Sequence, residues 1–311
     1  MKSIIFPKSL KKGDKIAIIS PAGSVEKEQL QSTLDLIISK GYQPVLGKNT
    51  LKNHQDGYTY AGTEKQRIDD LNWAFNDPDI KAIWATRGGY GCQHLVEHLQ
   101  LNRFKKNPKW YIGYSDNTVI QSFLMKKGFV SIHGQTLKTS SFGVTKESYD
   151  LIFDVLKGKS LNYTLEANKF NKKGKTKGQL IGGNLALIYA LLGTKYSFDF
   201  KDKILFIEDI GENFYALDRM LMSLELAGVF KKINGLIVGG MTNMGNETDN
   251  KAYEEAFDPF ALHLIEHRLK AYNFPVLYKF PNGHIRDNRP LIIGAEVSLK
   301  VGKSSEVNFK F

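Results

Sequence analysis

Three stretches of the sequence carry side chains suited to nucleophilic catalysis, and the first surrounds Ser115. In YIGYSDNT (111–118) a strand-like run passes directly into a helix-like run, with the serine at the turn. The residues GYSDN (113–117) follow the nucleophile-elbow pattern G-x-S-x-G, with Asn in place of the last Gly. Such a turn lifts the hydroxyl clear of the sheet, and the helix N-terminus behind it favours developing negative charge. The alternative is that Ser115 or Asp116 only caps the helix.

A serine nucleophile needs a base and an acid that orients the base. His284 lies beside Gly283 in FPNGHIRDN (280–288), which is expected to be a loop between strands. Glu208 directly follows the apolar run ILFI (204–207), and Asp209 and Glu212 are competing carboxylates. The order nucleophile, acid, base along the chain is that of α/β hydrolases, although the spacing differs from theirs.

Two matches to the zinc-peptidase pattern H-x-x-E-H offer a metal site instead, namely HLVEH (94–98) and HLIEH (263–267). Histidines four residues apart share a helical face, but a working zinc site also needs a third ligand, and neither copy supplies one. Because the flanks of the two copies are unrelated, we expect two polar helix faces and no metal site.

The glycine-rich run RGGYG (87–91) is typical of a loop that presents backbone N–H groups to an anion. A non-enzymatic phosphate-binding protein is therefore a remote alternative, but the run lacks the P-loop Lys and the G-x-G-x-x-G spacing. Cys92, the only cysteine, opens an apolar helical pattern and is expected to be a small buried hydrophobe.

The composition is that of a globular protein with room for two domains. The 311 residues include 43 basic and 32 acidic side chains, a net charge of +11. The sharpest basic cluster, NKFNKKGKTKG (168–178), has one aromatic residue, which favours a solvated linker over a nucleic-acid site. The positive charge could instead attract substrates with carboxylates.

No run of eighteen apolar residues occurs, and the opening apolar run is too short for a secretory signal, so we expect a soluble cytoplasmic protein.

The first half alternates strand-like and helix-like runs, which predicts a parallel sheet with helices on both faces. Strands are expected at 15–20, 42–46, 80–86, 109–114 and 129–133, and Thr63 is expected to cap one of the intervening helices. Since sites form at the carboxyl ends of such strands, Thr86, Ser115 and His133 should project toward one edge.

The second half predicts a smaller, mixed α/β region. Helices are expected at 184–192, 214–227 and 255–269, and strands at 203–207, 235–240, 275–279, 291–301 and 307–311, of which the last three should pair largely antiparallel. The predicted division is an N-terminal domain at 1–160, a basic linker at 161–177 and a C-terminal domain at 178–311.

Seven motifs taken in order identify a family: ATRGGYG, YIGYSDNT, SIHGQ, GQLIGGNL, ILFIEDIGE, YALDRML and FPNGHIRDN. They resemble the LD-carboxypeptidase family of serine peptidases, which includes the microcin-immunity peptidases, and the likeness runs from residue 13 to residue 301. The resemblance implies a glutamine-amidotransferase-like (flavodoxin-like) N-terminal domain, a smaller C-terminal domain, a triad assembled across their cleft, and often a homodimer.

By motif, the resemblance implies that Ser115 is the nucleophile, His284 the general base, and Glu208 rather than Asp209 the orienting acid. The implied activity is hydrolysis of the L,D peptide bond that releases terminal D-alanine from cell-wall tetrapeptides, in peptidoglycan recycling, without a metal or organic cofactor. The alternative within the family is a microcin-immunity-type peptidase that cleaves an aminoacyl-nucleotide antibiotic with the same triad.

The resemblance also implies an oxyanion hole made of backbone N–H groups, which we assign to Gly89 and Asp116. A carboxypeptidase must recognise a free carboxylate, and Arg87 beside the glycine loop could provide a bidentate pair, the alternative being a structural ion pair. Asn184, at an expected helix start, is a candidate for contact with the substrate backbone. Further candidates for the carboxylate are Arg219 and Arg286.

Overall fold

The structure is a computed structural model in which residues 4–245 and 256–310 are described. The chain divides into two compact units. Unit 1 comprises Met1–Lys159 and Arg289–Leu291, and unit 2 comprises Ser160–Asn288 and Ile292–Phe311. The chain therefore passes between units after Lys159, after Asn288 and after Leu291. Within the described ranges, no helix combines the length and the apolar composition needed to cross a bilayer.

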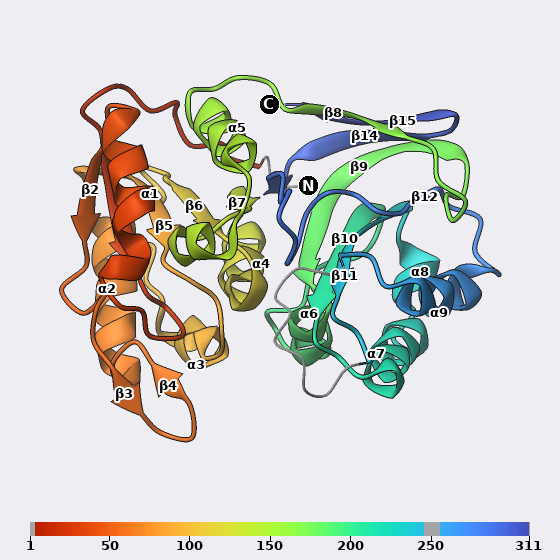
Figure 1. Ribbon diagram of the computed structural model, residues 1–311, viewed down its shortest axis with the longest axis horizontal. Helices are drawn as coiled ribbons and strands as arrows, with labels where there is room; N and C mark the ends of the chain where they lie inside the picture. Colours follow the sequence, from red (N-terminus) through yellow and green to blue (C-terminus); the bar gives the residue numbers. More distant parts are fainter. Residues whose placement is uncertain (1–3, 246–255, 311) are drawn as a thin grey trace. The chain divides into compact units, whose positions relative to one another are not determined.

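Unit 1 is built on a sheet whose strands alternate with helices along the chain (Figure 1). The neighbouring pairs β1–β2, β1–β5, β5–β6 and β6–β7 are all parallel, as the alternation predicts. The strand order is β13-β7-β6-β5-β1-β2. The bounds are β1 (Lys15–Ile19), β2 (Gln43–Leu46), β5 (Ile80–Ala85), β6 (Trp110–Gly113), β7 (Ser131–His133) and β13 (Leu291–Ile293).

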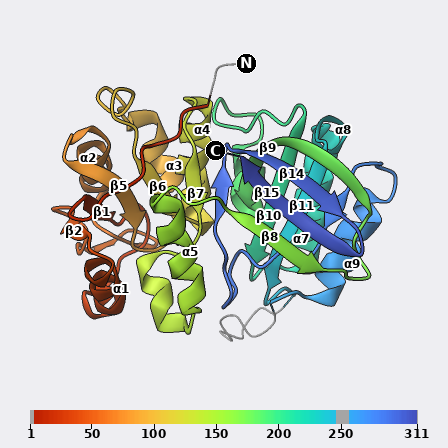
Figure 2. The same cartoon turned by 90° about the horizontal axis from the view of Figure 1, so that it is seen from above.

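Helices cover both faces of this sheet. Figure 2 shows α1 (Glu28–Ser39) and α5 (Lys146–Leu156) on one face, and α2 (Glu64–Asn76), α3 (Cys92–Leu95) and α4 (Thr118–Lys126) on the other. Thr63 caps α2 as expected, in a capping box with Gln66. A small hairpin of β3 (His54–Gln55) and β4 (Thr59–Tyr60) precedes α2.

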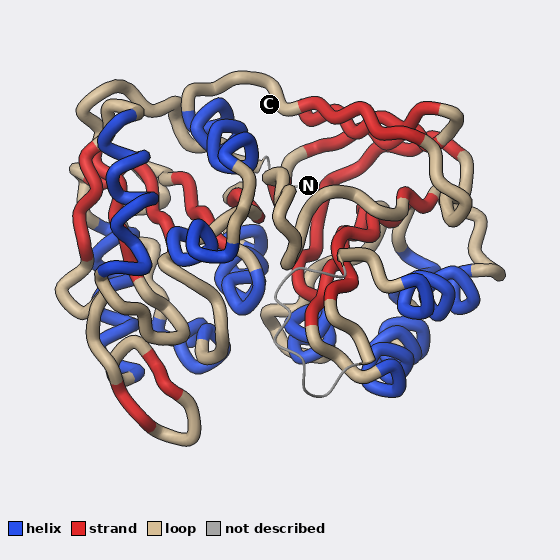
Figure 3. Tube along the Cα trace, viewed as in Figure 1, coloured by secondary structure: helices blue, strands red, loops and turns tan. Residues whose placement is uncertain are grey.

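Unit 2 contains a mixed sheet of order β12-β11-β10-β9-β14-β15-β8, with helices beside β10–β12 (Figure 3). The strands β9, β10, β11 and β12 pair parallel, whereas β9–β14, β14–β15 and β15–β8 pair antiparallel. The strands are β8 (Asn162–Glu166), β9 (Gly174–Asn184), β10 (Lys203–Ile210), β11 (Gly235–Thr242), β12 (Val276–Leu277), β14 (Glu296–Val301) and β15 (Ser304–Lys310). The helices are α6 (Leu185–Leu191), α7 (Phe214–Leu226), α8 (Val229–Lys232) and α9 (Pro259–Leu269).

The expected basic linker at 161–177 is wrong, because this segment contains β8 and the first part of β9. Lys175 and Lys177 alternate with Thr176 along β9 and are exposed, while Thr176 is half-buried and lies close to Gly235. When only composition is considered, a strand with lysines on one face resembles a solvent-exposed segment without secondary structure. The expected antiparallel pairing of residues 275–279 is also wrong, because β12 pairs parallel with β11. The antiparallel part of the sheet consists of the pairs β9–β14, β14–β15 and β15–β8.

Candidate active site

Ser115 lies where β6 ends, in the 3-10 turn η2 (Ser115–Asn117) that leads into α4. Its φ of 62° is in the left-handed region, which a residue with a Cβ rarely adopts. A serine held in a strained turn between a strand and a helix has the geometry of a nucleophile elbow. A Cβ on Gly88 would lie 2.8 Å from the Ser115 Cβ and 2.9 Å from its Oγ, so only glycine fits there. The sequence pointed to Gly89 in this loop and missed the close approach of Gly88.

The buried Asn117, which replaces the last glycine of the elbow pattern, holds this turn in place. Its Nδ2 donates to the carbonyls of Tyr114 (2.9 Å) and Arg87 (3.3 Å), and its Oδ1 accepts from the Tyr111 hydroxyl (2.5 Å). A Cβ on Gly113 would lie 2.7 Å from the Asn117 Cγ, which explains the glycine at the start of the motif. The asparagine thus links the serine turn to the strand end that carries the glycine loop.

Two buried charged side chains bind the backbone at the C-terminal end of the glycine loop. The Asp116 carboxylate accepts from the backbone N–H of Cys92 (2.8 Å), the first residue of α3. Arg67, from α2, donates to the carbonyl of Gly91 (3.1 Å) and is 2% exposed. A Cβ on Gly89 would overlap the Tyr58 hydroxyl. Arg67 and Tyr58 carry no sequence signal of this contribution, because both lie in otherwise ordinary helical and turn patterns.

In unit 2, His284 and Glu208 form a close pair. His284 Nδ1 lies 2.7 Å from Glu208 Oε2, with Glu208 fully buried and His284 8% exposed. Asp209 has different partners: its carboxylate accepts from Asn184 Nδ2 (2.8 Å) and from the backbone N–H of Ala186 (2.9 Å) in the first turn of α6. Of the two neighbouring carboxylates, Glu208 is therefore the one that contacts the histidine.

Glycines allow the histidine loop to reach Glu208. The pairing of β10 with β11 shifts register between Ile207 and Asp209, opposite Gly239 and Gly240. A Cβ on Gly239 would lie 2.5 Å from the Asn282 carbonyl oxygen, and Gly240 N donates to the same oxygen (2.8 Å). Gly283 has φ 120°, and a Cβ there would lie 2.8 Å from Glu208 Oε2. These positions need glycine because the loop passes directly over the strand ends.

Comparison with known proteins places both halves of the chain in one family. Residues 16–134 match the LD-carboxypeptidase N-terminal domain, and residues 177–299 match the LD-carboxypeptidase C-terminal domain. A relative from Bacillus subtilis, described as a probable murein peptide carboxypeptidase, is 32% identical over 97% of this chain and 93% of its own length. The chain belongs to the LD-carboxypeptidase family.

Solved structures agree with this LD-carboxypeptidase assignment. The crystal structure of muramoyltetrapeptide carboxypeptidase from Oxalobacter formigenes superposes with a TM-score of 0.83, at 26% identity, over 96% of this chain and 99% of that chain. The microcin C7 self-immunity protein in its wild-type apo state has a TM-score of 0.84 at 24% identity over 99% of both chains. At that identity the second likeness establishes the fold alone.

The sequence-predicted residues of this LD-carboxypeptidase family member fall in both units. Ser115, Asp116, Gly89 and Arg87 lie in unit 1, while Glu208, His284 and Asn184 lie in unit 2. Arg87 is half-buried, and its Nη1 donates to the carbonyl of Ser24 (3.0 Å). Asn184 caps α6 through Leu187 N (3.2 Å) and also binds Asp209, so its side chain contributes to the local structure whether or not it contacts a substrate.

The two H-x-x-E-H segments differ in structure. In the first, α3 ends at Leu95 and Val96–His98 form a 3-10 turn, so His94 and His98 do not share one α-helical face. In the second, His263 and His267 both lie on α9 and are exposed. Among residues 4–245 and 256–310, no three His, Cys, Asp or Glu side chains group as metal ligands.

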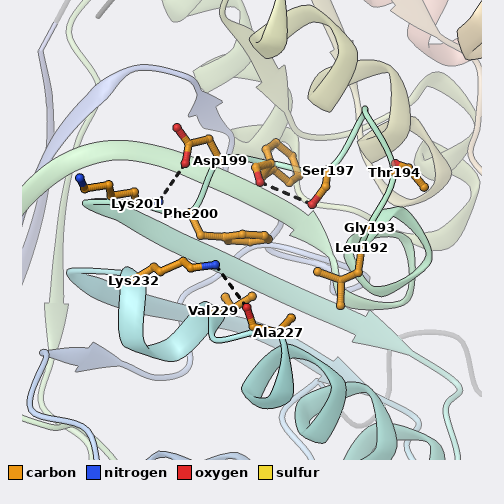
Figure 4. Close-up of a pocket in the computed structure, with 11 residues that line it drawn as sticks. Leu192, Gly193, Thr194, Ser197, Asp199, Phe200, Lys201, Ala227, Val229 and Lys232 are labelled. Atoms are coloured by element: carbon orange, nitrogen blue, oxygen red, sulfur yellow. Dashed lines mark hydrogen bonds between the residues drawn. The ribbon is translucent and has the colours of Figure 1, made fainter.

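Two cavities lie in unit 2, and neither is lined by Glu208 or His284. The first, of about 540 Å³, lies between the loop after α6 and the α7–α8 turn (Figure 4). Its polar groups bind one another: Lys232 Nζ donates to the carbonyl of Ala227 (3.3 Å), and Asp199 Oδ1 accepts from Lys201 N (3.2 Å). The second, of about 450 Å³, lies beside α9 and β12.

Burial raises the pKa of three side chains, namely Cys92, Asp116 and Asp209. Burial raises the pKa of the Cys92 thiol well above its usual range, so the thiol stays protonated, as expected for a small buried hydrophobe. Burial also raises the pKa of Asp116, to about 6, although the hydrogen bonds to Cys92 and the charge of Arg67 act in the opposite direction. Burial and the neighbouring Glu208 raise the pKa of Asp209 to about 7.

We expect Asp116 to make the folded protein less stable as the pH rises. The folded state holds this proton more tightly than the unfolded chain does, so stability present below pH about 4 is lost as the pH rises toward 6. A pKa raised by about two units corresponds to roughly 3 kcal/mol. Denaturant unfolding of wild type and Asp116→Asn from pH 4 to 8 measures this effect, because the asparagine keeps an acceptor for Cys92 N but does not titrate. The wild type should lose stability relative to the variant between pH 4 and 6; a constant difference would contradict the expectation.

Proposed function

We propose that the protein is a serine carboxypeptidase that releases terminal D-alanine from the L,D peptide bond of cell-wall tetrapeptides. The observation that carries the proposal is the 2.7 Å hydrogen bond between His284 Nδ1 and the buried Glu208. A carboxylate at Nδ1 favours the tautomer in which the proton lies on Nδ1 and Nε2 carries the lone pair that accepts a proton. The descriptions of two relatives as murein peptide and muramoyltetrapeptide carboxypeptidases support this choice of substrate.

In the proposed mechanism, His284 Nε2 accepts the Ser115 hydroxyl proton while Oγ attacks the carbonyl carbon of the scissile bond. Glu208 holds the resulting imidazolium. When the tetrahedral intermediate collapses, the C–N bond breaks and His284 returns the proton to the amine of the departing D-alanine. Water, deprotonated by the same imidazole, then hydrolyses the acyl-enzyme and restores the serine.

Backbone N–H groups of Gly89 and Asp116 are the proposed donors to the oxyanion. The left-handed backbone of Ser115 and the position of Asp116 in the first turn after β6 support this assignment, since N–H groups at such a turn are oriented together. We propose Arg87 as the partner of the substrate carboxylate, because it is half-buried next to the glycine loop.

The same proposal includes the cellular setting and the finer fold description. We propose that the enzyme acts in the cytoplasm in peptidoglycan recycling, as a homodimer, with no organic cofactor. The glutamine-amidotransferase-like (flavodoxin-like) description of unit 1 is supported by its strand order β2-β1-β5-β6-β7, in which the first strand lies between the second and third parallel strands.

The proposal is tested by incubating the purified protein with a muropeptide tetrapeptide and measuring free D-alanine. We expect release that continues in the presence of a chelator, because the proposed triad needs no metal. Activity that disappears with the chelator would overturn the serine mechanism. Absence of D-alanine release, together with cleavage of an aminoacyl-nucleotide analogue, would instead identify a microcin-immunity-type peptidase.

A further inference from the structure

The cavity beside α9 has an aromatic floor and a basic rim. Tyr278, Val276 and Leu269 form a buried floor, each at most 2% exposed. The ring of Phe170 lies against this floor, with its centroid 5.8 Å from that of Tyr278. Burial is the main cause that raises the pKa of Tyr278, so its hydroxyl stays neutral. Such a floor suits the face of a planar ring.

The rim of the cavity carries mostly cationic or protonatable groups. Lys169, His267 and Lys270 are exposed at its edge, and Lys169 Nζ lies 5.2 Å from the centroid of the Phe170 ring. The one acidic lining residue, Glu266, faces His263 at 3.7 Å. A small cavity with several cationic groups and one acid attracts anions.

A fixed amide side chain holds the Phe170 segment against the floor of the cavity. Asn171 Oδ1 accepts from Asn168 Nδ2 (2.9 Å) and from the backbone N–H of Tyr278 (2.9 Å), which fixes the orientation of the amide. Asn171 Nδ2 is buried, and it has no hydrogen-bond partner within the described part of the chain. With Asn168 Nδ2, which also donates to the carbonyl of Tyr278 (3.0 Å), this amide fixes the position of the Phe170 ring.

The segment that carries these groups is held in place by β12. Lys172 and Val276 exchange backbone hydrogen bonds of 3.0 Å in both directions, and the Lys172 ammonium group donates to the carbonyl of Tyr272. The lysine-rich run and the second H-x-x-E-H segment, which have no place in the proposed peptidase mechanism, therefore line the same cavity. Backbone pairing orders this site before any ligand binds, which lowers the entropic cost of binding.

We propose that this cavity binds a small phosphate monoester that carries a planar ring. The ring would lie on Phe170, which is half-buried above Tyr278, and the phosphate would accept hydrogen bonds from the exposed rim groups Lys169, His267 and Lys270. A phosphate offers three terminal oxygens and close to two negative charges, and so matches several separate donors better than a single carboxylate does. The volume of about 450 Å³ lies within the range of small-ligand pockets.

The test is calorimetric titration of the full chain with adenosine 5′-phosphate, adenosine and inorganic phosphate. We expect saturable binding of the monoester, at least tenfold tighter than that of either fragment. The double variant His267→Gln, Lys270→Gln should weaken it by at least tenfold, whereas Lys201→Gln at the other cavity (Figure 4) should not. The changed side chains are exposed, so all variants should keep the wild-type melting temperature.

Two further measurements sharpen the result. Phe170→Ala should weaken binding of the monoester and leave the weak binding of inorganic phosphate unchanged. Titration of the Ser115→Ala protein should give the wild-type affinity, which separates this cavity from the proposed catalytic serine. The proposal is overturned if no monoester binds, if the double variant keeps the wild-type affinity, or if inorganic phosphate binds as tightly as the monoester.

Discussion

Replacement of Ser115 by alanine should reduce kcat/KM for D-alanine release by a factor on the order of 10⁴ or more while leaving the fold intact. The proposed nucleophile is the Oγ atom, and without it only transition-state binding by the oxyanion donors remains. Alanine keeps a Cβ at φ 62°, so the strain of the turn and the packing against Gly88 stay the same. Steady-state kinetics with a tetrapeptide and a thermal melt measure the two effects separately.

Two matched variants make this result specific. Ser39→Ala removes an exposed hydroxyl on α1 that donates to the carbonyl of Leu36 in the same helix, and it should keep wild-type activity. Ser115→Gly should be as inactive as the alanine variant but more stable by roughly 1 kcal/mol, because glycine adopts a positive φ without strain. An alanine variant that retains more than a few per cent of the activity would rule out Ser115 as the nucleophile.

Glu208→Gln should lower kcat by about 10³-fold to 10⁴-fold with little change in KM. Glutamine has the same shape, but it can donate to His284 Nδ1 and thereby favour the wrong tautomer, and it cannot stabilise an imidazolium. The loss should therefore appear in the chemical step and not in substrate binding. Nitrogen NMR of His284 provides a second measurement, since the Nδ1 proton held by the 2.7 Å hydrogen bond should disappear or shift in the variant.

The neighbouring carboxylate is the natural control for this prediction. Asp209→Asn changes the adjacent carboxyl group, which binds Asn184 and the start of α6. It should alter the melting temperature but change kcat by less than tenfold. If the Asp209 variant lost more activity than the Glu208 variant, the assignment of the orienting acid would be incorrect.

The sequence predicted the elements of the site better than the contacts that hold them. Parallel strand ends, the turn at Ser115 and the loop at His284 follow from local patterns of apolar residues and glycine, and the structure contains them. Local patterns left the choice between Glu208 and Asp209 open, and only the family resemblance favoured Glu208. The reason is that a register shift beside β11 gives these adjacent carboxylates different partners. Arg67 and Asn117 were missed as supports for the same reason, since their hydrogen bonds join segments far apart in the chain.

The errors in the prediction also have physical causes. Residues 161–177 were expected to be a linker because their lysines dominate the composition, yet consecutive residues of β8 pair with β15 and those of β9 pair with β14. The first H-x-x-E-H segment was expected to lie on one helix, but α3 ends after one turn. The expected helix at 255–269 begins at Pro259 in the structure, and residue 255 lies outside the described residues.

The return of Arg289–Leu291 to unit 1 means that neither unit is a continuous length of chain. A fragment that ends at Lys159 would lack β13, and β7 would then become an open sheet edge. Open edges pair readily with other chains, so such a fragment would tend to aggregate. The N-terminal unit therefore cannot be fused to another protein as one continuous segment. A gene fusion that preserves it must also include Arg289–Leu291.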